Sequence, residues 1–164
     1  MSSRTPPGLP LRTEHVRHSA PPTRTGRAAM YQQMIFVNLP VENVDTSRKF
    51  FTELGYTINP QFSTEDCACV VISDTIVAMM LGKKRYADFT DKEIADATRT
   101  SEVLLCLSAE SREKVDELVE RAIAAGGTDR DDTQDHGFMY GRSFDDPDGH
   151  SWEVMWMDPA AVQG

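Results

Sequence analysis

The sequence predicts an α+β fold in which two βαβββ modules form a concave mixed sheet with the helices on its outer side. The main observation is an internal repeat, because a strand, a helix and three strands occur in residues 34–81 and again in residues 101–158. Each copy alone buries too little apolar surface, so the two must combine their sheets under their helices. A chain of 164 residues suits one such domain.

The first copy opens with an apolar strand from Met34 to Leu39. Asn43 can cap a helix over residues 44–54, and Gly55 can end it. Three short strands are expected after this helix, at residues 56–61, 66–73 and 75–81. Asp74 suits a tight hairpin between the last two.

The second copy begins with a strand from Glu102 to Ser108, followed by a helix that Ser111 can cap and Gly126 can end. The buried stripe of this helix has amphipathic spacing and consists of Val115, Leu118, Val119, Ala122 and Ile123. The remaining strands are expected at residues 128–133, 138–145 and 150–157. A strong turn, residues 146–149, precedes the last strand.

The other segments are polar. Residues 82–100 are a charged connector between the modules, and residues 159–164 form a tail. Residues 1–33 are rich in Pro, Ser, Thr and Arg and should be disordered. They are interpreted as a transit peptide, as a basic arm that contacts a partner, or as an over-long start before Met30. The prolines argue against a transit peptide, because they spoil its amphipathic helix, and the over-long start is the favoured interpretation.

Charge and composition exclude several classes of protein. Residues 1–33 carry +4 and the whole chain carries −9, which leaves −13 for the rest. This acidic body argues against a nucleic-acid partner. The sequence contains no run of about 18 apolar residues, which is the length that a membrane-spanning helix needs. Three sparse cysteines, Cys67, Cys69 and Cys106, are no disulfide framework and favour a cytoplasmic protein.

Alternation along the strands sorts their side chains into two faces. The face expected under the helices is uniformly apolar: Ile35, Val37, Leu39, Val77, Met79, Leu81, Val103, Leu105, Leu107, Trp152, Val154 and Trp156. The opposite face is apolar with a few polar groups: Met34, Phe36, Asn38, Ile76, Ala78, Met80, Glu102, Leu104, Cys106, Glu153, Met155 and Met157. An apolar concavity with a few convergent polar groups is typical of a small-molecule site.

Two segments resemble a known family. Residues 37–56, with Val37-Asn38-Leu39-Pro40-Val41 and Leu54-Gly55-Tyr56, are similar to the opening of vicinal-oxygen-chelate proteins. Residues 144–154, which contain Asp146-Pro147-Asp148-Gly149, resemble the ending of the same proteins. With the repeat, the likeness covers about residues 34–158. Residues 67–72 and 135–141 resemble a bacterial "glyoxalase family" subgroup.

This resemblance implies the paired βαβββ fold of glyoxalases, bleomycin resistance proteins and extradiol dioxygenases, commonly as a homodimer. Metal-dependent members use four ligand positions, which correspond here to Phe36, Ala78, Glu102 and Glu153. Two of these residues are apolar. Two carboxylates without an imidazole make a poor site for Zn²⁺, Ni²⁺ or Fe²⁺, so we expect no cofactor, although a divalent metal held by Glu102 and Glu153 remains an alternative.

Three residues are candidates for catalysis. Glu153 and Glu102 would form a proton-transfer dyad if their strands directed them toward each other. Otherwise Glu153 is satisfied by an arginine or water, and Glu102 reaches solvent at its strand start. His136 lies in a loop and could close over the site as an acid or base, or be an ordinary loop residue. His150, in the turn, is interpreted as structural.

The sequence therefore leaves three functions open. The first is binding of a small, partly apolar molecule in the cup, with contacts from Phe36, Asn38, Ala78, Met80, Cys106, Tyr140, Arg142 and Met155. The second is a metal-dependent lyase, isomerase or dioxygenase that uses Glu153 and Glu102. The third is a non-catalytic dimeric scaffold.

Overall fold

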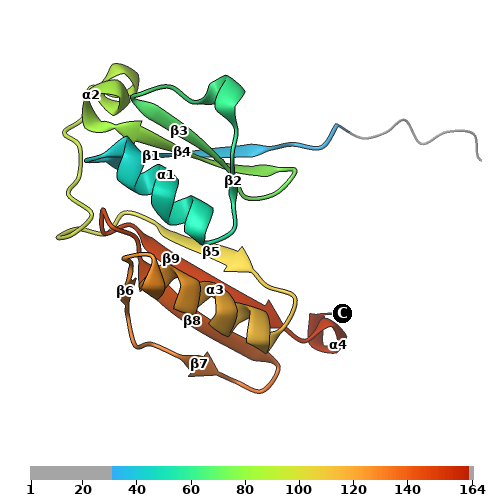
Figure 1. Cartoon of the computed structure of the whole chain (residues 1–164). Coiled ribbons are helices and arrows are strands. Elements are labelled where there is room, and N and C mark those ends of the chain that lie inside the picture. Colours follow the sequence, from blue (N-terminus) through green and yellow to red (C-terminus); the bar gives the residue numbers. More distant parts are fainter. Residues whose placement is uncertain (1–30, 163–164) are drawn as a thin grey trace, which may run out of the picture. The chain divides into compact units, whose positions relative to one another are not determined.

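The helix and the strands of the first module lie in the predicted order, although the strand expected at residues 56–61 is reduced to Thr57–Ile58 and is followed by a 3-10 helix. The structure is a computed structural model that describes residues 31–162, so the prediction for residues 1–30 lies outside the described residues. From Gln32 onward the chain forms one compact unit. Module one comprises β1 (Ile35–Val41), α1 (Val44–Glu53), β2 (Thr57–Ile58), the 3-10 helix η1 (Pro60–Phe62), β3 (Cys67–Val71) and β4 (Ile76–Gly82) (Figure 1).

Module two repeats this order after a linking segment. The link contains α2 (Lys83–Tyr86) and the 3-10 helix η2 (Ala87–Phe89), which replace part of the expected connector. Module two comprises β5 (Leu104–Ser108), α3 (Arg112–Ala124), β6 (Thr128–Asp129), β7 (Gln134–Asp135), β8 (Met139–Asp145) and β9 (Ser151–Met157). A short helix α4 (Pro159–Val162) lies in the predicted tail.

Both predicted helix caps are confirmed. The Asn43 side chain accepts a hydrogen bond from Thr46 N at 3.0 Å, and Ser111 Oγ accepts one from Lys114 N at 3.2 Å. Each cap satisfies a backbone N–H group that the first helical turn leaves without a partner.

The hydrogen bonds divide the strands into two sheets of related topology. One sheet has the order β1-β4-β3-β2 and the other the order β5-β9-β8-β6, with β7 also paired to β8. The pairs β1/β4 and β5/β9 are parallel, and the remaining pairs are antiparallel. The strands β1 and β5 are therefore edge strands, which explains why β1 tolerates Pro40, a residue without a backbone N–H group.

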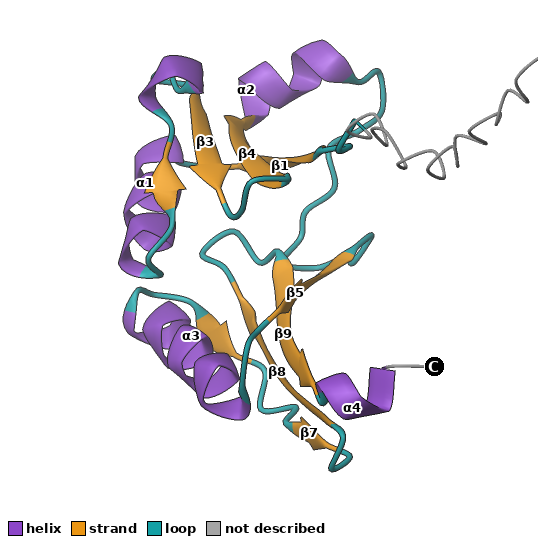
Figure 2. Cartoon of the chain, turned by 90° about the vertical axis from the view of Figure 1, so that its right-hand side faces the viewer, coloured by secondary structure: helices purple, strands orange, loops and turns teal. Residues whose placement is uncertain are grey.

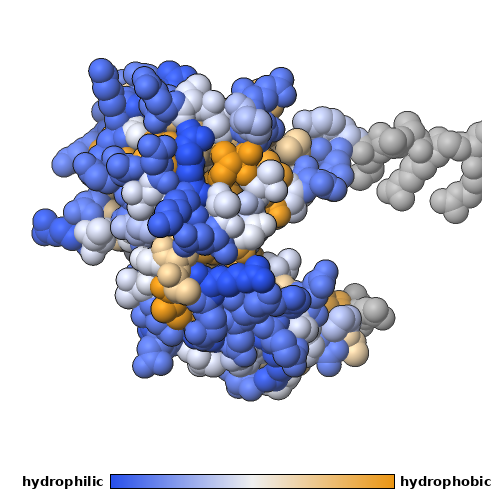
Figure 3. All heavy atoms as spheres, viewed as in Figure 1, coloured by the Kyte–Doolittle hydropathy of each residue, from blue (hydrophilic) through white to orange (hydrophobic). Residues whose placement is uncertain are grey.

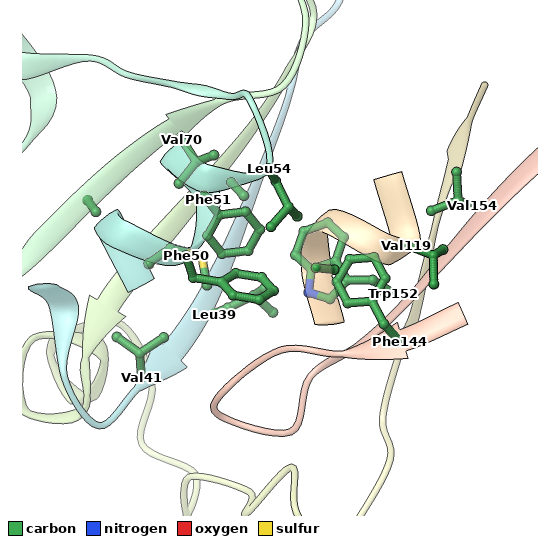
Figure 4. Close-up of a cluster of buried hydrophobic side chains, with 14 of the residues drawn as sticks. Leu39, Val41, Phe50, Phe51, Leu54, Val70, Val119, Phe144, Trp152 and Val154 are labelled. Atoms are coloured by element: carbon green, nitrogen blue, oxygen red, sulfur yellow. The ribbon is translucent and has the colours of Figure 1, made fainter. Parts of the chain in front are cut away.

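The two helices lie on the same side of the two sheets (Figure 2) and cover one shared core. Its centre is aromatic: the ring of Phe51 lies 5.5 Å from that of Trp152, and the ring of Phe50 lies 6.1 Å from that of Phe144 (Figure 4). Phe50 and Phe51 come from α1, whereas Phe144 and Trp152 come from β8 and β9. The core therefore joins the modules, as their small individual size requires.

The register of β4 corrects one prediction. Leu39 pairs with Met80 and Val37 pairs with Ala78, so these four side chains share the face under α1. Ala78 and Met80 are fully buried in the core. The assignment of Val77, Met79 and Leu81 to the helix side was wrong, and these residues share the opposite face with Phe36 and Asn38.

The helix side of the second sheet agrees with the prediction for β9. Trp152 and Val154 are buried against α3, and Trp156 packs against the same core. Between residues 31 and 162, the structure has no helix that is long and apolar enough to cross a membrane.

Candidate functional site

The turn before β9 is built around the buried carboxylate of Asp146. One oxygen, Oδ1, accepts hydrogen bonds from the backbone N–H groups of Asp148 and His150, both at 3.0 Å. The other, Oδ2, accepts from the indole Nε1 of Trp152 at 3.1 Å. Burial raises the pKa of Asp146, while His150 and the hydrogen bonds oppose the rise. Asp146 thus sets the shape of the turn from within.

The same turn binds module one. Asp148 Oδ1 accepts a hydrogen bond from Glu42 N at 2.8 Å, just beyond the end of β1. His150 Nε2 lies 2.7 Å from the Pro40 carbonyl oxygen and donates to it, because a carbonyl can only accept. This contact agrees with the structural role predicted for His150.

A hollow of about 410 Å³ lies between β1, this turn and the segment that links the modules. We call this segment, residues 83–103, the strap. The hollow has apolar and polar walls, which are formed by Val37, Asn38, Leu39, Pro40, Tyr86, Thr90, Lys92, Glu93, Ile94, Ala95, Ala97, Thr100, Ser101, Glu102, Val103, Gly149, His150 and Ser151. Of the candidates from the sequence, Asn38 and Glu102 line it.

A second hollow of about 80 Å³ lies on the open face of the second sheet. Its walls include Cys106, Met139, Ser143, Glu153 and Met155. Between residues 31 and 162, no ion pair or side-chain hydrogen bond engages the Glu153 carboxylate. Burial raises the pKa of the Cys106 thiol, and the charge of Glu153 beside it raises the pKa further. Cys106 is therefore a neutral thiol at neutral pH.

The two candidate carboxylates lie in different hollows. Cys106 pairs directly with Glu153 across β5 and β9, whereas Glu102 precedes β5 by two residues. Cys106 is four positions after Glu102, and four steps of extended chain span about 13 Å. Glu102 and Glu153 are therefore not directed at each other, as a proton-transfer dyad would require.

Tyr140 and Arg142 project toward α3, away from the face that bears Glu153. The hydroxyl of Tyr140 donates to Asp116 at 2.8 Å. The guanidinium of Arg142 binds Asp116 at 3.1 Å, Glu120 at 2.8 Å and Asp129 at 3.2 Å. These partners raise the pKa of Arg142 even though its burial acts to lower it. Both side chains are thus engaged in the packing of α3.

The other candidates are divided between the surface and the core. His136 is exposed in the turn between β7 and β8, where its backbone N–H donates to Met139 O, and it lines neither hollow. Phe36 is 55% exposed on β1. Met155 lines the small hollow, and Ala78 and Met80 belong to the core.

The donor set does not fit the metal that the fold family implies. Of the four corresponding positions, Phe36 and Ala78 offer no donor atom, and Glu102 and Glu153 are separated. Among residues 31–162, no group of three His, Cys, Asp or Glu side chains is placed to hold an ion. Transition metals in proteins are held by three or four such ligands.

The larger hollow contains residues that the sequence did not mark. Tyr86, Thr90, Lys92 and Glu93 lie on the strap, which has no apolar period and was interpreted as a solvated connector. No local pattern indicates that such a segment folds back over a site.

Comparisons with known proteins agree with this architecture. The family model described as "Bleomycin resistance protein-like N-terminal" matches residues 33–73. A search of curated proteins finds no match. Among solved structures, a hypothetical protein from S. aureus is 27% identical with a TM-score of 0.65, over 77% of this chain and 94% of that chain.

Two further structures share the fold. A glyoxalase/bleomycin resistance protein/dioxygenase family enzyme from Burkholderia phytofirmans is 17% identical with a TM-score of 0.63, over 77% of this chain and 99% of that chain. A glyoxalase-related enzyme from Fulvimarina pelagi is 22% identical with a TM-score of 0.63, over 76% of this chain and 88% of that chain. The protein thus has the glyoxalase/bleomycin resistance fold. This fold agrees with the resemblance to vicinal-oxygen-chelate proteins that the sequence predicts.

Proposed function

We propose that this protein binds a small, partly apolar molecule in the hollow at the junction of its modules, without a complete metal site. The observation that carries this proposal is the hollow of about 410 Å³ beside β1 and the strap. Ligand sites for small molecules commonly have volumes of about 300–1,000 Å³. The hollow at Glu153, of about 80 Å³, has room for only a few water-sized groups.

The lining indicates the chemistry of the ligand. Val37, Leu39 and Ile94 offer apolar contacts, while Asn38 offers an amide that can both donate and accept. Glu93 and Glu102 outnumber the single basic lining residue, Lys92. This balance favours an apolar or aromatic body that carries a cationic or hydrogen-bond-donating group.

The test uses proflavine, a fluorescent aromatic cation, as the probe. We expect saturable binding of one equivalent, and Glu102→Gln should weaken it about tenfold, equivalent to about 1.4 kcal/mol. Glu153→Gln is the matched control, because it makes the same change in the other hollow and should alter the affinity less than twofold. Failure of proflavine and of neutral aromatic probes to bind, or equal losses in the two variants, would contradict the proposal.

A metal-dependent lyase, isomerase or dioxygenase remains the second candidate, supported by the unpaired carboxylate of Glu153. Such an enzyme would need Glu102 and Glu153 in one site, and they line different hollows. The third candidate, a non-catalytic dimeric scaffold, would leave the larger hollow without a function.

We also propose that the protein is a homodimer. Within residues 31–162, the outer edges of β1 and β5 pair with no other strand. Apolar side chains on or near these strands are exposed, namely Ile35, Phe36, Val103 and Leu104. Figure 3 shows a notch between the modules with apolar surface beside it. Contiguous exposed apolar surface is typical of an interaction site, and a second copy offers a matching edge.

A further inference from the structure

The strap provides most of the wall of the larger hollow, so its position decides the shape of the site. It is held at its beginning by the ion pair of Lys83 with Glu42 and at its end by its continuation into β5. Between these ends, the backbone at Ala97 and Thr98 lies directly against the turn before β9.

The contact with the turn is made at Gly149. A Cβ atom placed on this glycine would lie 2.9 Å from Thr98 N and 3.0 Å from both the Ala97 carbonyl carbon and the Thr98 Cα. Side chains do not approach backbone atoms this closely without movement. The φ angle of Gly149 is +87°, which L-residues rarely adopt. Both the conformation and the close approach therefore require glycine.

The strap presents this backbone through a local turn of its own. Asp96 Oδ1 accepts hydrogen bonds from Thr98 N at 3.0 Å and Thr98 Oγ1 at 2.6 Å. The Asp96 carbonyl oxygen accepts from Arg99 N at 3.0 Å and Thr100 N at 2.9 Å. Asp96 thus shapes the segment that rests on Gly149, and Ala97 and Gly149 both line the hollow.

We propose that Gly149 is a positioning residue of the ligand site, whose missing side chain allows the strap to close against the turn. This inference rests on the proposed function, because it assigns a role to the wall of the same hollow. It gives the turn of residues 146–149 a second role beside the contact of Asp148 with Glu42. Any side chain at position 149 must push the strap outward and open the site.

The experiment compares glycine substitutions that separate two effects: backbone strain from a positive φ angle, and a clash of the added Cβ atom with neighbouring backbone atoms. Gly149→Ala introduces both. Gly137→Ala introduces the strain of a positive φ angle, +78°, but its Cβ meets nothing within 4 Å. Gly127→Ala introduces a close approach, 2.9 Å to Ala122 O and Asp145 O, away from the hollow.

Amide hydrogen exchange and proflavine affinity are measured on the full chain of each variant. We expect Gly149→Ala to accelerate exchange of the amides of residues 94–103 at least tenfold and to weaken proflavine binding at least tenfold. The two control variants should lose stability but keep the exchange rates of the strap and the affinity of the parent protein. Equal strap protection in the Gly149 and Gly137 variants would overturn the inference.

A second pair of variants covers the case in which Gly149→Ala does not fold. Asp96→Ala removes the turn on the exposed strap and should accelerate exchange in residues 97–103, whereas Asp91→Ala, the same change in the same segment, should not. No difference between these two variants would likewise overturn the inference. Hydrogen exchange needs no ligand, so a failure of proflavine to bind would count against the proposed function alone.

Discussion

His150 and Pro40 join the two modules through a single hydrogen bond, in which the imidazole Nε2–H donates to the Pro40 carbonyl oxygen at 2.7 Å. The two residues are 110 positions apart, and each belongs to a segment that resembles the family at one end of the chain. The bond therefore ties the opening strand to the ending turn through the backbone carbonyl of Pro40.

Replacement of His150 by Ala should destabilise the protein by about 1–3 kcal/mol, because the Pro40 carbonyl would lose its donor in a partly buried setting. Urea denaturation measures the change. Asp74→Ala, a change in the exposed hairpin of module one, is the control and should lie within about 0.5 kcal/mol of the parent. A loss at His150 no larger than the control's would show that the bond contributes nothing.

The aromatic contact between Phe51 and Trp152 should carry much of the coupling between the modules. Phe51→Ala removes a ring that is 1% exposed and should cost about 3–5 kcal/mol. Phe89→Ala removes a ring that is 66% exposed and should cost less than about 1 kcal/mol. Thermal unfolding of both variants measures these two losses of stability. Equal losses would show that the rings of the core are loosely packed.

The ion pair of Asp135 with Arg112 should make stability depend on acid. Arg112 lies 2.7 Å from Asp135 and, with a hydrogen bond from Gly137 N, lowers the pKa of Asp135 to about 2. A carboxyl group whose pKa is lower in the folded state stabilises the fold above its unfolded value, near 3.8, and loses this contribution as the pH falls toward 2.

Urea denaturation from pH 6 to pH 2.5 should therefore show a smaller loss of stability for Asp135→Asn than for the parent protein. The difference should develop below about pH 4. Parallel curves for the two proteins over this range would contradict the prediction.

Phe36→Glu should weaken the proposed dimer, because a charge on the β1 edge cannot be desolvated in an apolar interface. Light scattering during size exclusion reports the mass, and we expect a dimer for the parent and a monomer for the variant. Phe62→Glu alters a ring on η1 that is 60% exposed and should leave the dimer intact. A monomeric parent protein would exclude the dimer outright.

Elemental analysis of protein purified without chelator should find divalent metal well below one equivalent, because two of the family's four ligand positions, Phe36 and Ala78, lack donors. No divalent ion should raise the melting temperature appreciably. Near-stoichiometric metal that is lost in Glu153→Gln would contradict our interpretation and favour the metal-dependent enzyme.

Much of the fold could be predicted from local signals. The caps at Asn43 and Ser111 and the stripe of α3 depend only on residues within a few positions of one another, so the sequence contains them directly. The helix side of β9 was also predictable, since Trp152 and Val154 alternate with Glu153 and the contrast is strong. The family likeness then followed from short motifs at the two ends of the repeat.

The candidate site was less predictable, and β4 shows why. Its two faces, with Val77 and Met79 on one and Ala78 and Met80 on the other, are equally apolar, so alternation cannot distinguish them. Only the parallel register with β1 decides which pair is buried. Arg142 presents the same difficulty, because the acids that bind it, Asp116, Glu120 and Asp129, come from α3 and β6.

The sequence by itself determined the repeat, the two capped helices and the class of fold, because these depend on periodicity and on short-range capping. Only the tertiary structure decided where the proposed ligand site lies. The larger hollow exists because the strap folds back against Gly149 and because His150 holds the turn to Pro40. Such contacts join segments of the chain far apart in sequence, and no local pattern of residues encodes their meeting.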